Sequence, residues 1–243
     1  MNPSVYLVGG LGNQLWIGLF VHHLLHRYNS VDVDISWYQP YSRFFFNPSR
    51  TQRLFQHDLL RRTLPRARFS SRFSLLILYR LSTLSLLRGA LQKHLCFHSG
   101  YFQYPDMITD QYLMALRDSL YSIVNERYSS SISSILFGSY DSIHIRVGDR
   151  GSVTLDTLHQ YLDKLLPILS PTVYILSDDT SIAIQAFDYL DEKLECKLVL
   201  PEHSCELLDF FILSRSGTVF AFRESTFSFW AQQLTRLNTP HPK

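Results

Sequence analysis

The sequence has few cysteines and no long apolar segment. Its 243 residues include three cysteines (Cys96, Cys196 and Cys205), an odd number without metal-ligand spacing. This usage is typical of a cytosolic protein, and we expect reduced thiols in the core. No apolar run approaches the ~20 residues that span a bilayer, and a strand expected from about Ser4 leaves no room for a signal peptide. We therefore expect a cytoplasmic protein.

Acids are nearly missing from one segment, although the net charge of the whole chain is only +2. Residues 50–94 contain ten Arg or Lys residues and one acid, Asp58. Such a block suits an anionic surface or an anionic substrate. We expect helices in residues 51–94, where a basic amphipathic helix could lie on an anionic membrane, and an ordinary solvated helical face is the alternative. A peripheral contact with the inner membrane face fits this block, and no nucleic-acid partner is expected.

The composition is that of a globular protein, with 46% apolar and 18% charged residues. The length suits one large domain or two small ones. A Ser-rich stretch at residues 129–134 is the best candidate for a linker. We therefore expect an N-terminal domain of residues 1–130 and a C-terminal domain of residues 131–243.

The second half of the chain alternates between strand and helix patterns. Strands are predicted at residues 142–145, 172–176, 196–200 and 218–222, and helices at residues 155–169, 181–189, 204–214 and 226–237. Four such units in succession predict a parallel sheet with right-handed crossovers. All four strands then end on one rim of the sheet, where ligands bind in open α/β folds.

The first of these strands carries polar groups to the rim. Residues 142–149 read SIHIRVGD, so an apolar strand ends in His144, Arg146, Gly148 and Asp149. A guanidinium holds phosphate oxygens with paired, charge-assisted hydrogen bonds, so Arg146 would clamp an anion. Gly148 would let the backbone approach a ligand closely. An exposed ion pair between Arg146 and Asp149 is the alternative.

Three further turns bring polar residues to the same part of the predicted sheet. They contain Ser177, Asp178 and Asp179 after the second strand, Glu206 in the first turn of the third helix, and Ser225 and Thr226 before the last helix. We expect one of the two aspartates to bind a purine or ribose and the other to cap a helix. The two hydroxyls suit a phosphate or plain capping, and the glutamate suits a ribose or the helix dipole. No third acid or histidine has the spacing of a metal site, so no metal is expected.

A glycine-rich turn at residues 9–14, GGLGNQ, joins a predicted strand to an apolar helix. It lacks the third glycine of the dinucleotide motif, because Leu15 stands there, and the candidate acids Asp32 and Asp34 lie within the next strand pattern. Its backbone N–H groups and the Asn13 amide would still suit an anion or a sugar hydroxyl. A tight turn with Asn13 as the helix cap is the alternative. The residues that we place in this binding turn are Gly10, Gly12, Asn13 and Gln14.

Six stretches of the sequence together resemble one enzyme family. Residues 144–149, HIRVGD, resemble the H-x-R-R-G-D motif of α1,2-fucosyltransferases and of their α1,6- and protein-O-fucosyltransferase relatives. The other similar stretches are residues 9–15, 100–103, 174–179, 206–209 and 224–230. They occur in the family's order and cover nearly the whole chain, which makes the set specific although each match is weak singly.

The resemblance implies an α/β fold of the GT-B type, with two Rossmann-like domains facing across a cleft. The N-terminal domain would hold the acceptor and the C-terminal domain GDP-fucose, in an inverting reaction that needs no metal and no cofactor beyond this donor. By matched position, Arg146 would grip the β-phosphate, and His144 with Asp178 or Asp179 would contact the guanosine. Ser225 or Thr226 would touch the diphosphate.

The sequence departs from the family motif at two positions. Val147 replaces the second arginine, and Arg150 replaces an aromatic residue. Either one arginine suffices, or Arg150 or another basic residue substitutes, or activity is weakened. The rival hypotheses are therefore a non-catalytic GDP-sugar-binding module, and the same scaffold transferring another sugar or forming another linkage.

The resemblance also suggests a mechanism. An acceptor hydroxyl would displace GDP directly at the fucose anomeric carbon, with Arg146 stabilising the leaving diphosphate. Asp149 is the candidate general base. The alternatives are His144, if nucleotide does not occupy it, and a reaction without an essential base. The expected acceptor is a galactose-containing oligosaccharide, which the basic segment would suit if it were lipid-linked, as in bacterial O-antigen assembly.

Overall fold

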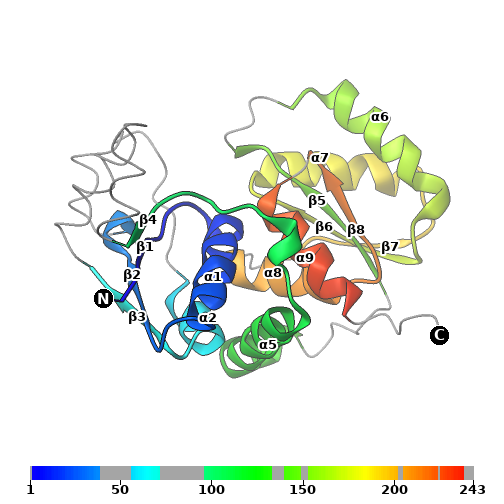
Figure 1. The fold of residues 1–243 in the computed structure, drawn as a ribbon. Helices are drawn as coiled ribbons and strands as arrows, with labels where there is room; N and C mark the ends of the chain where they lie inside the picture. The colour runs from blue at the N-terminus through cyan, green and yellow to red at the C-terminus, as the bar shows by residue number, and fades with distance from the viewer. Residues whose placement is uncertain are drawn as a thin grey trace. The chain divides into compact units, whose positions relative to one another are not determined.

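The computed structural model describes residues 2–38, 56–71, 96–132, 140–148, 153–201, 205–223 and 225–237. The chain divides into two compact units, Met1–Ser119 and Leu120–Lys243, and each contains a parallel sheet with helices (Figure 1). The division falls within helix α5 (Asp110–Ile132). The domain boundary expected at residues 130 and 131 lies near the C-terminal end of the same helix.

The first unit contains a four-stranded parallel sheet in the order β3-β2-β1-β4. The strands are β1 (Ser4–Tyr6), β2 (Val31–Asp34), β3 (Ala67–Ser70) and β4 (Phe97–His98). The chain adds β2 and β3 on one side of β1 and then returns to add β4 on the other side. In open α/β sheets, ligands bind where the strand order reverses in this way. The loops at this reversal are the glycine-rich turn after β1 and the segment after β4.

Strand β3 contradicts the expectation of helices throughout residues 51–94. Helix α2 (His57–Thr63) is present, but the basic stretch that follows it forms the edge strand. Arg68 Nη2 lies 2.8 Å from Asp32 Oδ1 on the neighbouring strand, and Arg66 Nη2 donates a hydrogen bond of 2.6 Å to a carbonyl oxygen of α1. Two arginines of the basic segment therefore bond to neighbouring elements of the first unit. The expected amphipathic helix lies outside the described residues.

Helix α1 (Leu11–Leu25) is apolar on nearly every side and is largely buried, as expected for the helix after the glycine-rich turn. Gly18 allows Tyr112 of α5 to approach it, because a Cβ at that position would lie 2.7 Å from the tyrosine Oη. This hydroxyl donates a hydrogen bond of 2.9 Å to the Leu15 carbonyl oxygen. Two short 3₁₀ helices, η1 (Ser36–Tyr38) and η3 (Pro105–Met107), are also present.

The second unit confirms the predicted alternation of strands and helices. Its sheet is parallel, in the order β7-β6-β5-β8. The elements are β5 (Asp141–Ile145), α6 (Leu155–Leu165), η5 (Leu166–Ile168), β6 (Thr172–Ser177), α7 (Thr180–Asp191), β7 (Lys197–Val199), α8 (Glu206–Arg215), β8 (Val219–Phe222) and α9 (Thr226–Arg236).

The core of this unit explains the placement of its helices. Leucines at 158, 162 and 165 form one stripe of α6, and they pack with α7 against the apolar side chains of β5 and β6. Helices α8 and α9 pack on each other, and Thr235 Oγ1 donates a hydrogen bond of 3.3 Å to the Leu213 carbonyl oxygen. Because crossovers are right-handed, the reversal of strand order puts these two helices on the other face of the sheet (Figure 1).

The register between β5 and β6 is fixed at both ends of β5. At its start, the Asp141 N–H donates to Ser170 Oγ at 2.9 Å, and the Ser170 N–H donates to Asp141 Oδ2 at 2.8 Å. At its far end, Ser177 Oγ donates to the Ile145 carbonyl oxygen at 2.8 Å. A slip of one residue would turn every side chain of β5 to the other face, so these bonds determine which of them reach the rim.

Candidate functional site

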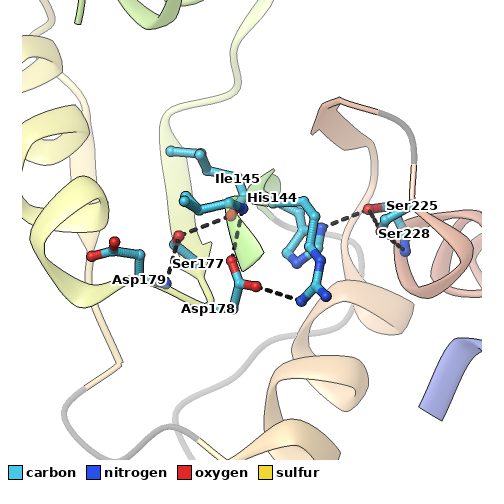
Figure 2. A network of polar contacts seen from close by, with 9 residues as sticks. His144, Ile145, Ser177, Asp178, Asp179, Ser225 and Ser228 are labelled. Carbon is cyan, nitrogen blue, oxygen red and sulfur yellow. Dashed lines mark hydrogen bonds and ion pairs between the residues drawn. The ribbon is translucent and has the colours of Figure 1, made fainter. Parts of the chain in front are cut away.

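The candidate site lies at the carboxyl end of β5, where the strand order of the second sheet reverses. The chain passes from β5 to β6 and β7 and then returns to the other side of β5 with β8. Residues from the ends of β5 and β6 and from the start of α9 are joined there by hydrogen bonds, as Figure 2 shows. The structure thus brings together the end of β5, the turn at residues 177–179 and the start of α9, which the sequence placed on one rim.

Asp178 holds Arg146 at this rim. Its Oδ2 forms an ion pair with Arg146 Nη1, and its Oδ1 accepts a hydrogen bond of 2.8 Å from the Val147 N–H. The Arg146 N–H donates to the Phe222 carbonyl oxygen at 3.3 Å, which continues the pairing of β5 with β8. The ion pair considered for Arg146 therefore has Asp178 as a partner. Asp149 lies outside the described residues.

Gly148 makes room for this ion pair. Its φ is +31°, in the region that favours glycine, and a Cβ there would lie 2.7 Å from Asp178 Oδ2 and 2.8 Å from the Arg146 guanidinium carbon. Any larger residue would have to displace the carboxylate or the guanidinium. The glycine expected to allow a close approach to a ligand therefore also allows a close approach between two charged side chains.

The two aspartates after β6 have different tasks. Asp179 caps α7, because its Oδ1 accepts hydrogen bonds from the N–H groups of Ser181 at 2.9 Å and Ile182 at 3.4 Å. These bonds, with the Ser181 hydroxyl as the largest contribution, hold the pKa of Asp179 below its usual value. The Ser177 hydroxyl accepts from the Asp179 N–H at 3.1 Å and bonds β5 on its other side, so it shapes the turn. Asp178 is left as the acid that faces Arg146.

His144 is buried beneath the rim, with 5% of its surface exposed. Burial lowers its pKa to about 4; nearby Asp178 acts in the opposite direction and Arg146 lowers it further. The imidazole is therefore neutral at neutral pH and carries a proton on one of its two ring nitrogens. Its Nδ1 lies 2.6 Å from Ser228 Oγ. The ring of Phe227 packs beside it, with 5.2 Å between ring centroids.

Helix α9 begins beside His144. Ser225 is its N-cap and accepts a hydrogen bond of 3.1 Å from the Ser228 N–H, and Thr226 is its first residue. The two serine hydroxyls lie 2.9 Å apart. Ser228 was not among the expected site residues; its signals in the sequence were its place within the matched stretch 224–230 and its position three residues after a helix-capping serine. Phe227 and Phe229 are half-buried, and Trp230 is fully buried.

The glycine-rich turn lies in the first unit, and its buried polar groups serve mainly to hold the turn in shape. The N-cap of α1 is Gly10, without a side-chain cap, so the interpretation of Asn13 as the cap is wrong. Gln14 is buried; its Nε2 donates to the Gly9 carbonyl oxygen at 3.2 Å and its Oε1 accepts from the Gln56 N–H at 3.0 Å. Its amide therefore holds the turn, and the neighbouring Asn13 is half-buried.

The same turn contacts the segment after β4. Gln103 Nε2 lies 3.5 Å from Asn13 Oδ1, and the Phe102 ring stacks on Phe20 of α1 with 4.0 Å between centroids. Phe102 has a φ of +49°, a conformation that costs energy for a bulky residue and is often found near functional sites. On either side of it, Tyr101 and Tyr104 expose 47% and 57% of their surface. Gly12 is buried beneath this region, and Gly10 is half-buried.

Several other candidate residues serve the fold. Asp32 pairs with Arg68, and both oxygens of Asp34 bond to Ser36, through its N–H and its hydroxyl at 3.0 Å each. Both acids therefore bond within the fold, whereas the dinucleotide interpretation required one of them to bind a ribose. Glu206 is half-buried in the first turn of α8.

The structure also bears on the expectations for metal ions, cysteines and membrane spans. Among the described residues, no cluster of three or more His, Cys, Asp or Glu side chains could hold a metal ion. The three cysteines are free and half-buried rather than in the core. In the part of the chain that the structure describes, no helix has the length and apolar character needed to cross a membrane.

Comparisons with known proteins gave structural likenesses only. No protein-family model matches the sequence, and no curated protein matches it. Among solved structures, the chain is similar to POFUT1 in complex with GDP-fucose, with 12% identity, a TM-score of 0.48, and coverage of 96% of this chain and 94% of that chain. It is also similar to POFUT1 in complex with GDP, with 12% identity, a TM-score of 0.46, and coverage of 97% and 96%. Such values do not by themselves establish a family or an activity for this chain.

Proposed function

We propose that this chain is a glycosyltransferase that moves fucose from GDP-fucose to a galactoside hydroxyl, forming an α1,2 linkage with inversion and without a metal ion. The observation that carries the proposal is the placement of Arg146 by Asp178 and Gly148 at the reversal of strand order, on the strand whose His144 is hydrogen-bonded to the first turn of α9. The six matched stretches of sequence support the donor and the linkage.

The proposed chemistry follows from charge. Negative charge develops on the diphosphate as GDP leaves, and a guanidinium with two parallel N–H groups is well suited to receive it. The start of α9 adds the positive end of a helix dipole and free backbone N–H groups, which also favour phosphate oxygens. His144 and Asp178 are the proposed guanosine contacts, and Ser225 and Thr226 are the proposed diphosphate contacts. Asp149 remains the proposed general base.

The acceptor is proposed to meet the first unit. The loops after β1 and β4 lie at the reversal of its strand order. They carry two exposed tyrosines, Tyr101 and Tyr104, and two amides, Asn13 and Gln103. Aromatic faces and neutral amides suit the C–H faces and hydroxyls of an uncharged sugar. A galactose-containing oligosaccharide fits this chemistry, and the GT-B arrangement of the two units remains part of the proposal.

Contact with a membrane is a further part of the proposal, because the basic segment would suit a lipid-linked acceptor. Since Arg66 and Arg68 bond within the fold, the exposed pair Arg61 and Arg62 is the part to test. Replacing both by glutamine should reduce sedimentation with vesicles containing anionic lipid and leave the background with neutral vesicles unchanged. Equal sedimentation of wild type and variant would remove the membrane from the proposal.

The decisive test of the function uses labelled GDP-fucose with and without galactosides. Arg146→Ala should lower kcat about 10²–10³-fold, the usual effect of removing one donor to a developing negative charge. Arg146→Lys should rescue poorly, because an ammonium lacks the planar fork. Arg117→Ala is the matched control, since that arginine pairs with Asp118 on α5. A kcat/KM within a few-fold of wild type for Arg146→Ala would exclude the assignment.

Two observations favour the rival, a GDP-sugar-binding module without catalysis. Asp178 already neutralises Arg146, and Val147 stands where the resembling family has a second arginine. The rival predicts that GDP binds and that no acceptor is turned over. Slow hydrolysis specific for GDP-fucose over other GDP-sugars would argue against it, and transfer from a different GDP-sugar would indicate the other sugar or linkage.

A further inference from the structure

A chain of hydrogen bonds runs from the first turn of α9 to the buried imidazole of His144 (Figure 2). Ser225 Oγ lies 2.9 Å from Ser228 Oγ, which lies 2.6 Å from His144 Nδ1. Ser225 Oγ also accepts the Ser228 N–H at 3.1 Å. Ser228 and His144 are almost completely buried. The chain thus connects a half-buried hydroxyl at a helix start with an imidazole of the binding region.

Counting protons shows that this chain has two arrangements. A neutral imidazole carries one N–H, and each serine carries one O–H. The Ser228 hydroxyl can donate to only one of its two neighbours, so it must accept from the other. The direction of the Ser225–Ser228 bond and the tautomer of His144 therefore change together.

In the first arrangement, His144 Nδ1–H donates to Ser228, and Ser228 donates to Ser225. The Ser225 hydroxyl proton is then free for a ligand, and His144 Nε2 is a bare acceptor. In the second arrangement, Ser225 donates to Ser228, and Ser228 donates to His144 Nδ1. The proton of the imidazole is then on Nε2, and Ser225 has no proton left to offer. Among the described residues, no hydrogen-bond partner is found for Nε2.

A phosphate oxygen selects between these arrangements, because it accepts a hydrogen bond from a hydroxyl and cannot donate one to it. We propose that Ser228 is a positioning residue that couples the binding of a diphosphate at Ser225 to the tautomer of His144, and so makes Nε2 an acceptor when the diphosphate is bound. The group that meets Nε2 in the complex must then donate a hydrogen bond, as a ring N–H, an amino group or a hydroxyl does. This inference rests on the proposed function, because it takes the ligand to be a nucleoside diphosphate sugar.

The coupling can be measured on the ring nitrogens of protein labelled with ¹⁵N-histidine. A bare ring nitrogen and a protonated one resonate far apart, and the His144→Asn variant identifies which signals belong to this residue. The probes are inorganic pyrophosphate and GDP, with their binding followed separately by calorimetry. In wild type, saturation with either probe should move the His144 proton to Nδ1.

Two variants separate coupling from mere packing. Ser228→Ala should bind GDP about tenfold more weakly, the size of one lost hydrogen bond, and should show no change of tautomer on binding. Ser228→Thr keeps the hydroxyl and should restore the tautomer change. If Ser228→Ala does not fold, the wild-type titration alone decides the matter.

The outcomes distinguish this proposal from the proposed function. Binding of pyrophosphate or GDP with an unchanged His144 tautomer in wild type would overturn the coupling and leave the proposed function standing. The same tautomer change in wild type and Ser228→Ala would overturn the role of Ser228. Failure of both probes to bind would overturn the coupling together with the proposed function.

Discussion

Replacing Gly148 by alanine would test whether the site depends on the close approach of two charged side chains. The added Cβ would lie 2.7 Å from Asp178 Oδ2 and 2.8 Å from the Arg146 guanidinium carbon, so both groups must move by several tenths of an ångström or more. A misplacement of about 1 Å in a catalytic group can cost about 100-fold in rate. We therefore expect kcat/KM for fucosyl transfer to fall about 100-fold. We also expect the variant to bind GDP much more weakly than wild type does.

The same substitution also strains the backbone, and this effect must be separated from the first. At a φ of +31° a non-glycine residue costs about 1–2 kcal/mol, which corresponds to a fall in Tm of only a few degrees for a protein of this size. Gly100→Ala is the matched control, because Gly100 has a φ of +139° and its added Cβ would meet only the Phe102 ring, at 3.9 Å. Calorimetry with GDP and thermal melting should be run on both variants.

The two variants are expected to differ in their binding of GDP. Both should melt somewhat below wild type, but only Gly148→Ala should bind GDP much more weakly. If Gly148→Ala binds GDP and turns over within about threefold of wild type, a loss smaller than one net hydrogen bond commonly accounts for, the ion pair with Asp178 does not position Arg146. Equal weakening of GDP binding in Gly100→Ala would attribute the effect to the backbone strain instead.

Three further predictions concern acid stability, the general base and the acceptor. Because burial holds the pKa of His144 near 4 instead of 6.5, the unfolded chain gains a proton between these values that the folded chain does not; urea titrations should show about 3 kcal/mol lost as pH falls through this window, and His144→Asn should lack that part of the loss. Asp149→Asn should lower kcat about 100-fold or more if Asp149 is the base, and a loss confined to KM would remove it from that role. Tyr101→Ala and Tyr104→Ala should each raise KM for a galactoside about three- to tenfold with KM for GDP-fucose unchanged, and Tyr28→Ala, an exposed tyrosine at the end of α1, should change neither.

The second unit could be predicted closely from the sequence because its pattern is local. Short strands that contain β-branched residues, such as Asp141–Ile145 and Thr172–Ser177, are bounded by polar turns, and helices such as Leu155–Leu165 repeat leucine with the helical period. Parallel pairing then follows from the alternation itself, without any knowledge of which strands are neighbours. The rim, with Arg146 and the turn at residues 177–179, follows from the same argument.

The contacts between elements could not be predicted, because they depend on register and on neighbours distant in the sequence. Strand Ala67–Ser70 was missed because its sequence, ARFS, is short and basic, and it becomes a strand only by pairing with β2, where Arg68 meets Asp32. The ion-pair partner Asp178 of Arg146 lies in the turn after the next strand, and the hydrogen-bond partner of His144 lies on the last helix. The inward position of Gln14 could not be predicted, because an amide in a glycine-rich turn looks the same in sequence whether it faces outward or inward.

The bonds at the two ends of β5 have a practical consequence for protein engineering. Asp141 with Ser170 at one end, and Ser177 with Ile145 at the other, hold β5 in register with β6. A library that searches for variants accepting other nucleotide sugars should therefore leave these four positions unchanged, so that the guanidinium of Arg146 stays at the rim.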